Sequence, residues 1–218
     1  MAARFTTCCI SCNKQIRDET YNIDFYPNLL VTLSAFIVLG AIVVLLVYLH
    51  CKQQRMSANW KDLPDPVPMG TAALVLGIGL GGFIDGIVFH QIFQWHEMFS
   101  AKLPATDYVG KSINMFWDGI FHAFCLLVVL TGVIMLWRTS RKSISYQSGW
   151  LLSGALLSGW AIFNLVEGTI NHHILKLHNV MEYSQDHDLA NGVFLAASVL
   201  LLMSGILLSR IHYCEATS

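Results

Sequence analysis

The residues of this chain best suited to chemistry lie in two copies of an acid–histidine motif, 82 positions apart. The copies read Asp85-Gly86-x3-His90-x-Ile92-x3-His96 and Glu167-Gly168-x3-His172-x-Ile174-x3-His178. Carboxylates and imidazoles together are common ligands of transition-metal ions. Each copy adjoins an apolar run long enough to span a membrane, where ionisable side chains are costly unless they are paired or bind an ion. The motif therefore predicts an intramembrane metal or proton site.

A second acid–histidine pair, Asp118 and His122, lies four residues apart, so both side chains share one face of a predicted helix. A hydrogen-bonded pair that only stabilises the protein is the alternative. Asp85 and His90 are five apart, roughly 140° around an ideal α-helix, so sharing one ion requires a distortion at Gly86. His172 and His173 are adjacent and point in different directions, so we expect only one of them to bind the metal ion. The predicted ligands are Asp85, His90, Asp118, His122, Glu167, His172 and His173.

Five further residues are predicted to surround this site without being its main ligands. His96 and His178 follow the ends of the predicted spans, so we expect them at the aqueous surface, either as entry ligands or without a ligand role. Metal occupancy should then depend more on Asp118 and His122 than on this distal pair. Asn114, Asn164 and Asn171 are predicted to orient ligands, because amides that bond to imidazoles fix their tautomers.

The composition is that of a membrane protein. Of the 218 residues, 55% are hydrophobic and only 12% are charged, against about 25% charged in soluble domains. Five runs reach the roughly 20 residues that a helix needs to cross a bilayer: 29–49, 71–93, 113–137, 150–171 and 189–209. The net charge of -1 gives no support for nucleic-acid binding. We predict an all-α integral membrane protein with five transmembrane helices in a lipid bilayer.

The basic residues predict how the chain is oriented. Seven of them fall on one side of the predicted spans: Lys52, Arg55, Lys61, Arg138, Arg141, Lys142 and Arg210. The two loops on the opposite side hold three lysines, so the positive-inside bias puts the seven in the cytoplasm. We expect a multi-pass protein of the inner (cytoplasmic) membrane with its N-terminus outside. Since successive spans alternate in direction, the acids and histidines should meet in the outer leaflet.

The chain divides into four predicted segments. Residues 1–28 form an extracytoplasmic tail with Cys8, Cys9 and Cys12, and residues 29–50 an additional transmembrane helix. Residues 51–70 form a linker whose three prolines favour extended backbone. Residues 71–211 form a four-helix membrane domain. Its two hairpins enter in the same direction and carry the two motif copies, which predicts a bundle of two parallel-repeated hairpins about a pseudo-twofold axis.

Three stretches also carry a family resemblance: GFIDGIVFHQIFQWHEM, NMFWDGIFHAF and FNLVEGTINHHILKLHNV. They resemble an uncharacterised family of bacterial predicted inner-membrane proteins with four spans, over roughly residues 70–210. That family usually doubles its distal histidines, whereas Glu97 and Asn179 follow His96 and His178 here. The resemblance implies no reaction. Its members resemble neighbours of cytochrome-oxidase assembly proteins, which implies respiratory or metal-handling membrane proteins as partners.

Three functions fit these residues. The first is a metalloprotein with a mono- or dinuclear site, in the role of an oxidoreductase. The second is a copper carrier or respiratory-oxidase assembly factor that receives the ion from the cysteine tail. The third is a b-type haem protein with His90 and His172 as axial ligands, which the nearby acids disfavour because haem iron needs no carboxylate. We expect a transition metal, with iron or copper favoured and zinc as the third candidate.

The predicted orientation can be tested with thiols. A membrane-impermeant thiol reagent, applied to intact cells after reduction, should label Cys8, Cys9 or Cys12 but not Cys51 or Cys214. Labelling of the tail only after lysis would invert the orientation and move the acid–histidine layer to the cytoplasmic leaflet.

Overall fold

The structure, a computed structural model, describes residues 13–21, 67–141 and 148–216, together with scattered residues between 27 and 49. Within these residues every regular element is a helix. The elements are α1 (Lys14–Thr20), α3 (Val67–Ile84), η2 (Asp85–Ile92), α4 (Tyr108–Ser140), α5 (Gly149–Glu167), η3 (Gly168–Ile174) and α6 (His187–Ala216). The π-helical segments η2 and η3 continue α3 and α5 directly, so each pair forms one rod.

Four helices in the described ranges are long and apolar enough to cross a membrane: Val67–Ile92, Tyr108–Ser140, Gly149–Ile174 and His187–Ile211. They correspond to the last four predicted spans. The first predicted span, the cysteine tail and most of the linker lie largely outside the described residues, so the fifth helix stays a prediction. Helix α3 begins at Val67, earlier than expected, and includes Pro68 in its first turn. Proline is tolerated there because the first backbone N–H groups of a helix have no partner within it.

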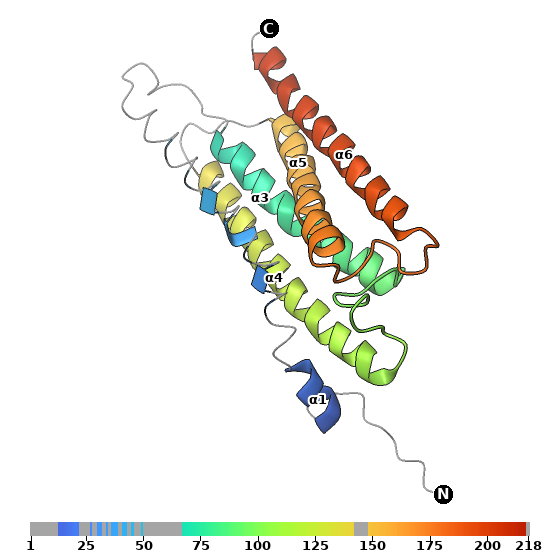
Figure 1. Cartoon of the computed structure of the whole chain (residues 1–218). Helices are drawn as coiled ribbons and strands as arrows, with labels where there is room; N and C mark the ends of the chain where they lie inside the picture. The colour runs from blue at the N-terminus through green and yellow to red at the C-terminus, as the bar shows by residue number, and fades with distance from the viewer. Residues whose placement is uncertain are drawn as a thin grey trace, which may run out of the picture.

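Helices α3 and α5, which carry the two motif copies, form the inner pair of the bundle. Helix α4 packs on α3 and helix α6 packs on α5, so the four rods lie in the order α4, α3, α5, α6 (Figure 1). A much larger share of the inner pair is buried than of the outer pair. The outer helices therefore present most of their apolar side chains to lipid, and the acids and histidines of the inner pair are shielded from it.

Two glycines allow the inner helices to touch. A Cβ atom added at Gly77 would lie 2.2 Å from the carbonyl oxygen of Leu156, and one added at Gly159 would lie 2.1 Å from that of Leu74. Without side chains at these positions the backbones meet directly, as small residues allow in membrane helices. The two contacts are equivalent, because Gly159 and Leu156 lie 82 positions after Gly77 and Leu74.

The loops after η2 and η3 fold back over one end of the bundle (Figure 1). Phe99 and Leu177 from these loops are fully buried and join Ile113, Phe121 and Phe163 in the hydrophobic core. Helix α4 starts next to this core, where the Asp107 side chain accepts a hydrogen bond from Gly110 N at 2.8 Å. Such N-capping satisfies an otherwise unpaired backbone donor. The packed loops hold the helix ends together above the acids and histidines.

The helix contact at Gly159 predicts the effect of a single methyl group. Gly159→Ala should lower the free energy of unfolding by about 1–3 kcal/mol, because the added carbon meets rigid backbone and forces the helices apart. Thermal unfolding in detergent would measure this. Gly119→Ala is the matched control, since no described atom lies within 4 Å of a Cβ added there. Equal stability of the two variants would contradict the direct backbone contact.

Candidate metal centre

Each motif copy places its acid and first histidine on a π-helical turn. In a π-helix the backbone hydrogen bond runs from residue i to i+5, so side chains five apart lie one turn apart on the same face. His90 Nε2 lies 3.2 Å from Asp85 Oδ2, and His172 Nε2 lies 3.2 Å from Glu167 Oε1. The distortion that the spacing required is therefore present in both copies.

The two π-turns end in the same way. Phe93 N donates to Val88 O at 2.8 Å and Leu175 N donates to Ile170 O at 2.7 Å. The next residues, Gln94 and Lys176, have φ angles of 52° and 50°. This left-handed conformation is uncommon for residues other than glycine. It ends the helix and turns the chain back toward the bundle.

The reversal corrects the expected position of the distal histidines. His96 and His178 are only 3% and 1% exposed, so they do not lie at the aqueous surface. They lie beyond the ends of the membrane-length helices, as expected, but the loops carry them back inside. Burial, together with the neighbouring His90, lowers the pKa of His96 to about 4. His96 is therefore neutral at physiological pH, which is the form that binds metal.

Six buried side chains form one group, which we call the acid–imidazole cluster. Its members are Asp85, His90, His96, Glu167, His172 and His178. Among the described residues, two triads could each hold a metal ion, because one potential ligand atom from each of the three residues lies within 4.8 Å of the other two. The triads are His90, His96 and His178, and Glu167, His172 and His178. The rings of His96 and His178 stack with centroids 4.6 Å apart. Since His178 belongs to both triads, the two motif copies build one site.

Hydrogen bonds fix the tautomers of the distal histidines. His96 Nδ1 lies 2.8 Å from the carbonyl oxygen of Val180, and His178 Nδ1 lies 3.1 Å from that of Met98. A carbonyl oxygen only accepts, so Nδ1 carries the proton and Nε2 offers its lone pair. Each ring bonds to the loop of the other motif copy.

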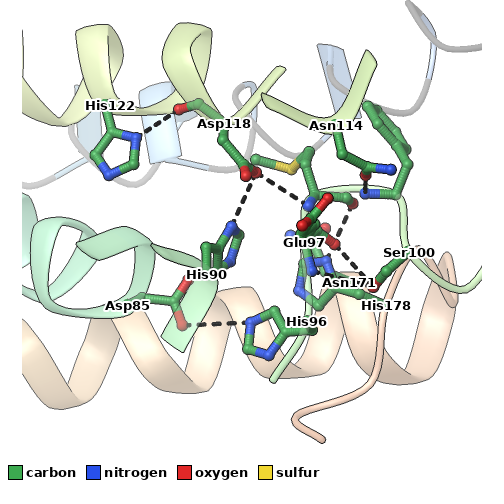
Figure 2. Close-up of polar contacts among 12 residues, drawn as sticks. Asp85, His90, His96, Glu97, Ser100, Asn114, Asp118, His122, Asn171 and His178 are labelled. Atoms are coloured by element: carbon green, nitrogen blue, oxygen red, sulfur yellow. Dashed lines mark hydrogen bonds and ion pairs between the residues drawn. The ribbon is translucent and has the colours of Figure 1, made fainter. Parts of the chain in front are cut away.

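The first histidine of the first copy is oriented by a carboxylate. His90 Nδ1 donates to Asp118 Oδ1 at 2.9 Å, and Figure 2 shows His90 between Asp85 and Asp118. The same Asp118 oxygen accepts from Met98 N at 3.0 Å. A carboxylate behind an imidazole is a common support for metal-binding histidines.

The Nε2 atoms of the cluster face carboxylate oxygens. His178 Nε2 lies 2.8 Å from Glu167 Oε1, and His96 Nε2 lies 3.7 Å from Asp85 Oδ1. With the ring proton already on Nδ1, a nitrogen lone pair meets a carboxylate lone pair, and two acceptors repel unless a cation lies between them. Either additional protons or a metal ion must supply that positive charge.

Several ligand atoms of the cluster have nothing else to bind. Nε2 of His90, His96 and His172 and Oε2 of Glu167 are buried with no hydrogen-bond partner among the described residues. Buried polar atoms in proteins are nearly always satisfied. The three imidazole nitrogens lie 3.2–3.7 Å from carboxylate oxygens, and imidazole nitrogen with carboxylate oxygen is a donor set that suits a borderline transition-metal ion.

Three residues predicted as ligands lie outside the cluster. Asp118 supports His90 from behind. His122 donates through Nδ1 to the backbone oxygen of Asp118 at 2.7 Å and lies apart from the cluster in Figure 2. His173 is exposed on η3. The structure therefore brings together Asp85, His90, Glu167 and His172 of the predicted set, and adds the distal pair.

The predicted asparagines have different positions. Asn114 is fully buried and holds the first loop: Oδ1 accepts from Phe99 N at 2.8 Å, and Nδ2 donates to Leu103 O at 2.9 Å. Asn164 is half-buried in α5, and its backbone oxygen accepts from Gly168 N. Among the described residues, neither side-chain amide forms a hydrogen bond with a histidine of the cluster.

One contribution was not anticipated from the sequence, whereas the third predicted asparagine, Asn171, does reach an acid of the cluster. The carbonyl groups of Met98 and Val180 orient the distal histidines, although no residue type marks a backbone carbonyl. Asn171 Nδ2 lies 3.4 Å from Glu167 Oε1, four residues along the same rod. That contact follows a helical spacing that is readable in the sequence.

Gly86 lies where η2 meets His122. A Cβ atom at Gly86 would lie 2.4 Å from His122 Nε2, so Gly86→Ala should lower the free energy of unfolding by about 1–3 kcal/mol. Adding His122→Ala should recover most of the loss, as thermal unfolding in detergent would show. His122→Ala alone is the control, and a double variant as unstable as Gly86→Ala would contradict this contact.

Comparison with known proteins adds a family and no more. A family model described as Predicted membrane protein (DUF2243) matches residues 72–212, which is more than half of the chain. Neither the curated proteins nor the solved structures gave a significant match. The matched segment contains both π-turns and every member of the acid–imidazole cluster. The chain therefore belongs to this family of predicted membrane proteins, whose function is unknown.

Proposed function

We propose that the protein is an integral membrane metalloprotein that holds one or two transition-metal ions at the acid–imidazole cluster. The observation that carries the proposal is the orientation of the distal histidines. His96 and His178 each commit Nδ1 to a carbonyl oxygen and aim Nε2 at the acids. A divalent cation there offsets the charge of Asp85 and Glu167, which is expensive at membrane depth.

We further propose that the two hairpins are related by a pseudo-twofold axis through this site. Three kinds of contact repeat with the 82-residue offset. They are the acid–histidine distances of 3.2 Å, the exchanged carbonyl bonds, and the glycine contacts of α3 and α5. An axis between the stacked rings of His96 and His178 accounts for all three. The predicted parallel repeat thus gains support from contacts that do not depend on sequence identity.

The ligand types narrow the choice of ion. Four imidazoles and two carboxylates suit Fe, Mn, Zn and Cu(II), whereas Cu(I) favours thiolates and thioethers. The cluster as described contains no sulfur ligand. Iron and copper(II) remain the favoured ions, with zinc third. When bound, a redox-active ion would supply electron transfer, which is the chemistry that the proposed oxidoreductase role needs.

The geometry favours bound ions over the other two functions. The two rings expected to ligate haem, His90 and His172, each face a carboxylate at 3.2 Å, and the ring of His96 lies against both. A porphyrin has no place between rings in such contact. A copper carrier needs ligands that release their ion, whereas here the buried rings of His90, His96 and His178 are held by hydrogen bonds at Nδ1. Respiratory or metal-handling partners stay a prediction.

Elemental analysis tests the proposal directly. The full chain, purified in mild detergent without chelators, should contain about one or two transition-metal ions per chain, as the overlapping triads imply. Protein that is free of metal and takes up none on reconstitution would refute the metalloprotein. A strong Soret band would instead support haem.

Substitution of the distal pair tests which residues hold the ion. His96→Ala or His178→Ala should weaken metal affinity by roughly 10- to 100-fold or more, since even residues that only support ligands have effects of that size. Metal content after dialysis against a chelator series would measure it. His173→Ala is the matched control, because this exposed residue adjoins His172. Equal losses in all three variants would show that the site lies elsewhere.

A further inference from the structure

A cavity of about 570 Å³ lies between the two loops at the end of the bundle. Its walls come from both loops and from the starts of α4 and α6. Its polar lining includes His96, Glu97, Ser100, Lys111, Asn179 and Glu182. Of the six members of the acid–imidazole cluster, His96 alone lines this cavity as the structure describes it. His96 is therefore the residue through which the cavity adjoins the cluster.

The cavity lies over the proposed axis. Four pairs of its lining residues are related by the 82-residue offset: Glu97 with Asn179, Ser100 with Glu182, Ala101 with Tyr183, and Ala105 with His187. The second pair is in contact, because Ser100 Oγ donates to Glu182 Oε1 at 2.9 Å. The stacked rings of His96 and His178 lie on the same axis, so the cavity leads toward the middle of the cluster.

Glu97 is a carboxylate of the cavity wall that has one oxygen atom without a hydrogen-bond partner among the described residues. It is 4% exposed, and its Oε1 forms an ion pair with Lys111. Its Oε2 is buried with no hydrogen-bond partner in the described part of the chain. Burial raises the pKa of Glu97, although Lys111 opposes the shift. A second positive partner would relieve the cost of burying this oxygen.

Glu182, the other carboxylate of the cavity, is already occupied. Its Oε1 accepts from Ser100 Oγ at 2.9 Å and from Asn179 N at 3.0 Å. Its Oε2 accepts from Asn179 Nδ2 at 3.1 Å. Glu182 therefore ties the two loops together, and Glu97 is left to receive a ligand.

We propose that this cavity is the entry chamber of the metal site, and that Glu97 receives a hydrated divalent cation before His96 does. The proposal rests on the function proposed above. Lys111 pairs with Glu97 while the chamber is empty, and an arriving cation displaces it. Lys111 is partly exposed, with 35% of its side chain accessible, so it can turn to solvent without a conformational change in the loops.

The chemistry sets the direction of each effect. A carboxylate in a cleft attracts cations and raises their rate of arrival, whereas a lysine beside it reduces that attraction. Neither side chain belongs to the cluster, so both should change how fast the ion enters and not how many ions are held. A ligand role for Glu97 would instead change the number held.

Kinetics of metal uptake tests the proposal. The full chain, stripped of metal in detergent, is mixed with Co²⁺, and the absorbance of cobalt bound to nitrogen ligands is followed with time. Glu97→Gln should slow uptake roughly tenfold and Lys111→Met should accelerate it, both with unchanged final stoichiometry. The difference should shrink in high salt, which screens charges in the open cavity.

Two control variants remove the same charges, one positive and one negative, at the same end of the bundle. Lys102→Met and Asp188→Asn alter exposed residues outside the cavity wall and should leave the rate unchanged. Unchanged rates in Glu97→Gln and Lys111→Met, or equal effects in the controls, would overturn the entry chamber. So would reduced stoichiometry in Glu97→Gln, which would make it a ligand. Failure of the unaltered protein to bind Co²⁺ would refute the metal site itself.

Discussion

The structure depends on one electrostatic constraint: two carboxylates are buried against imidazole nitrogens whose protons are already placed elsewhere. Asp85 and Glu167 face the Nε2 lone pairs of His96 and His178, at 3.7 and 2.8 Å, because Nδ1 of each ring already donates to a carbonyl oxygen. An arrangement of acceptors facing acceptors is unstable without positive charge between them. The inner position of α3 and α5 follows from this constraint, because only helices covered on both sides keep such a group away from lipid.

The π-helical turns are the backbone's solution to that constraint. An α-helix presents residues i and i+4 on one face, yet both motif copies place the histidine five residues after the acid. Widening one turn aligns them, and the left-handed residues Gln94 and Lys176 then end the rod and return the chain. π-turns cost hydrogen-bond geometry and occur often at functional sites. Here the gain is the convergence of four imidazoles, two from the rods and two from the loops that follow them.

Much of this could be predicted from the sequence, for identifiable reasons. The length of the apolar runs predicted the last four spans, and the recurrence of the motif predicted one site shared by both halves. The buried position of His96 and His178 could not be predicted, because it depends on loop carbonyls at Met98 and Val180 that no side chain marks. Asp118 and His122 share a helix face, yet Asp118 contacts His90 and His122 bonds to the backbone of α4, because a four-residue spacing does not say which side chain reaches a neighbouring helix.

The two halves of the cluster are not equivalent, because the residues on the Nδ1 side of the imidazoles differ. Asp118 accepts from both His90 Nδ1 and Met98 N, whereas Asn191, in the corresponding place, accepts from Val180 N at 2.9 Å. No described residue bonds to His172 Nδ1. A carboxylate behind an imidazole makes it a stronger ligand. One nearly symmetric backbone therefore supports its two imidazoles differently, with a carboxylate behind His90 and none behind His172, and that inequality follows a single exchange of aspartate for asparagine.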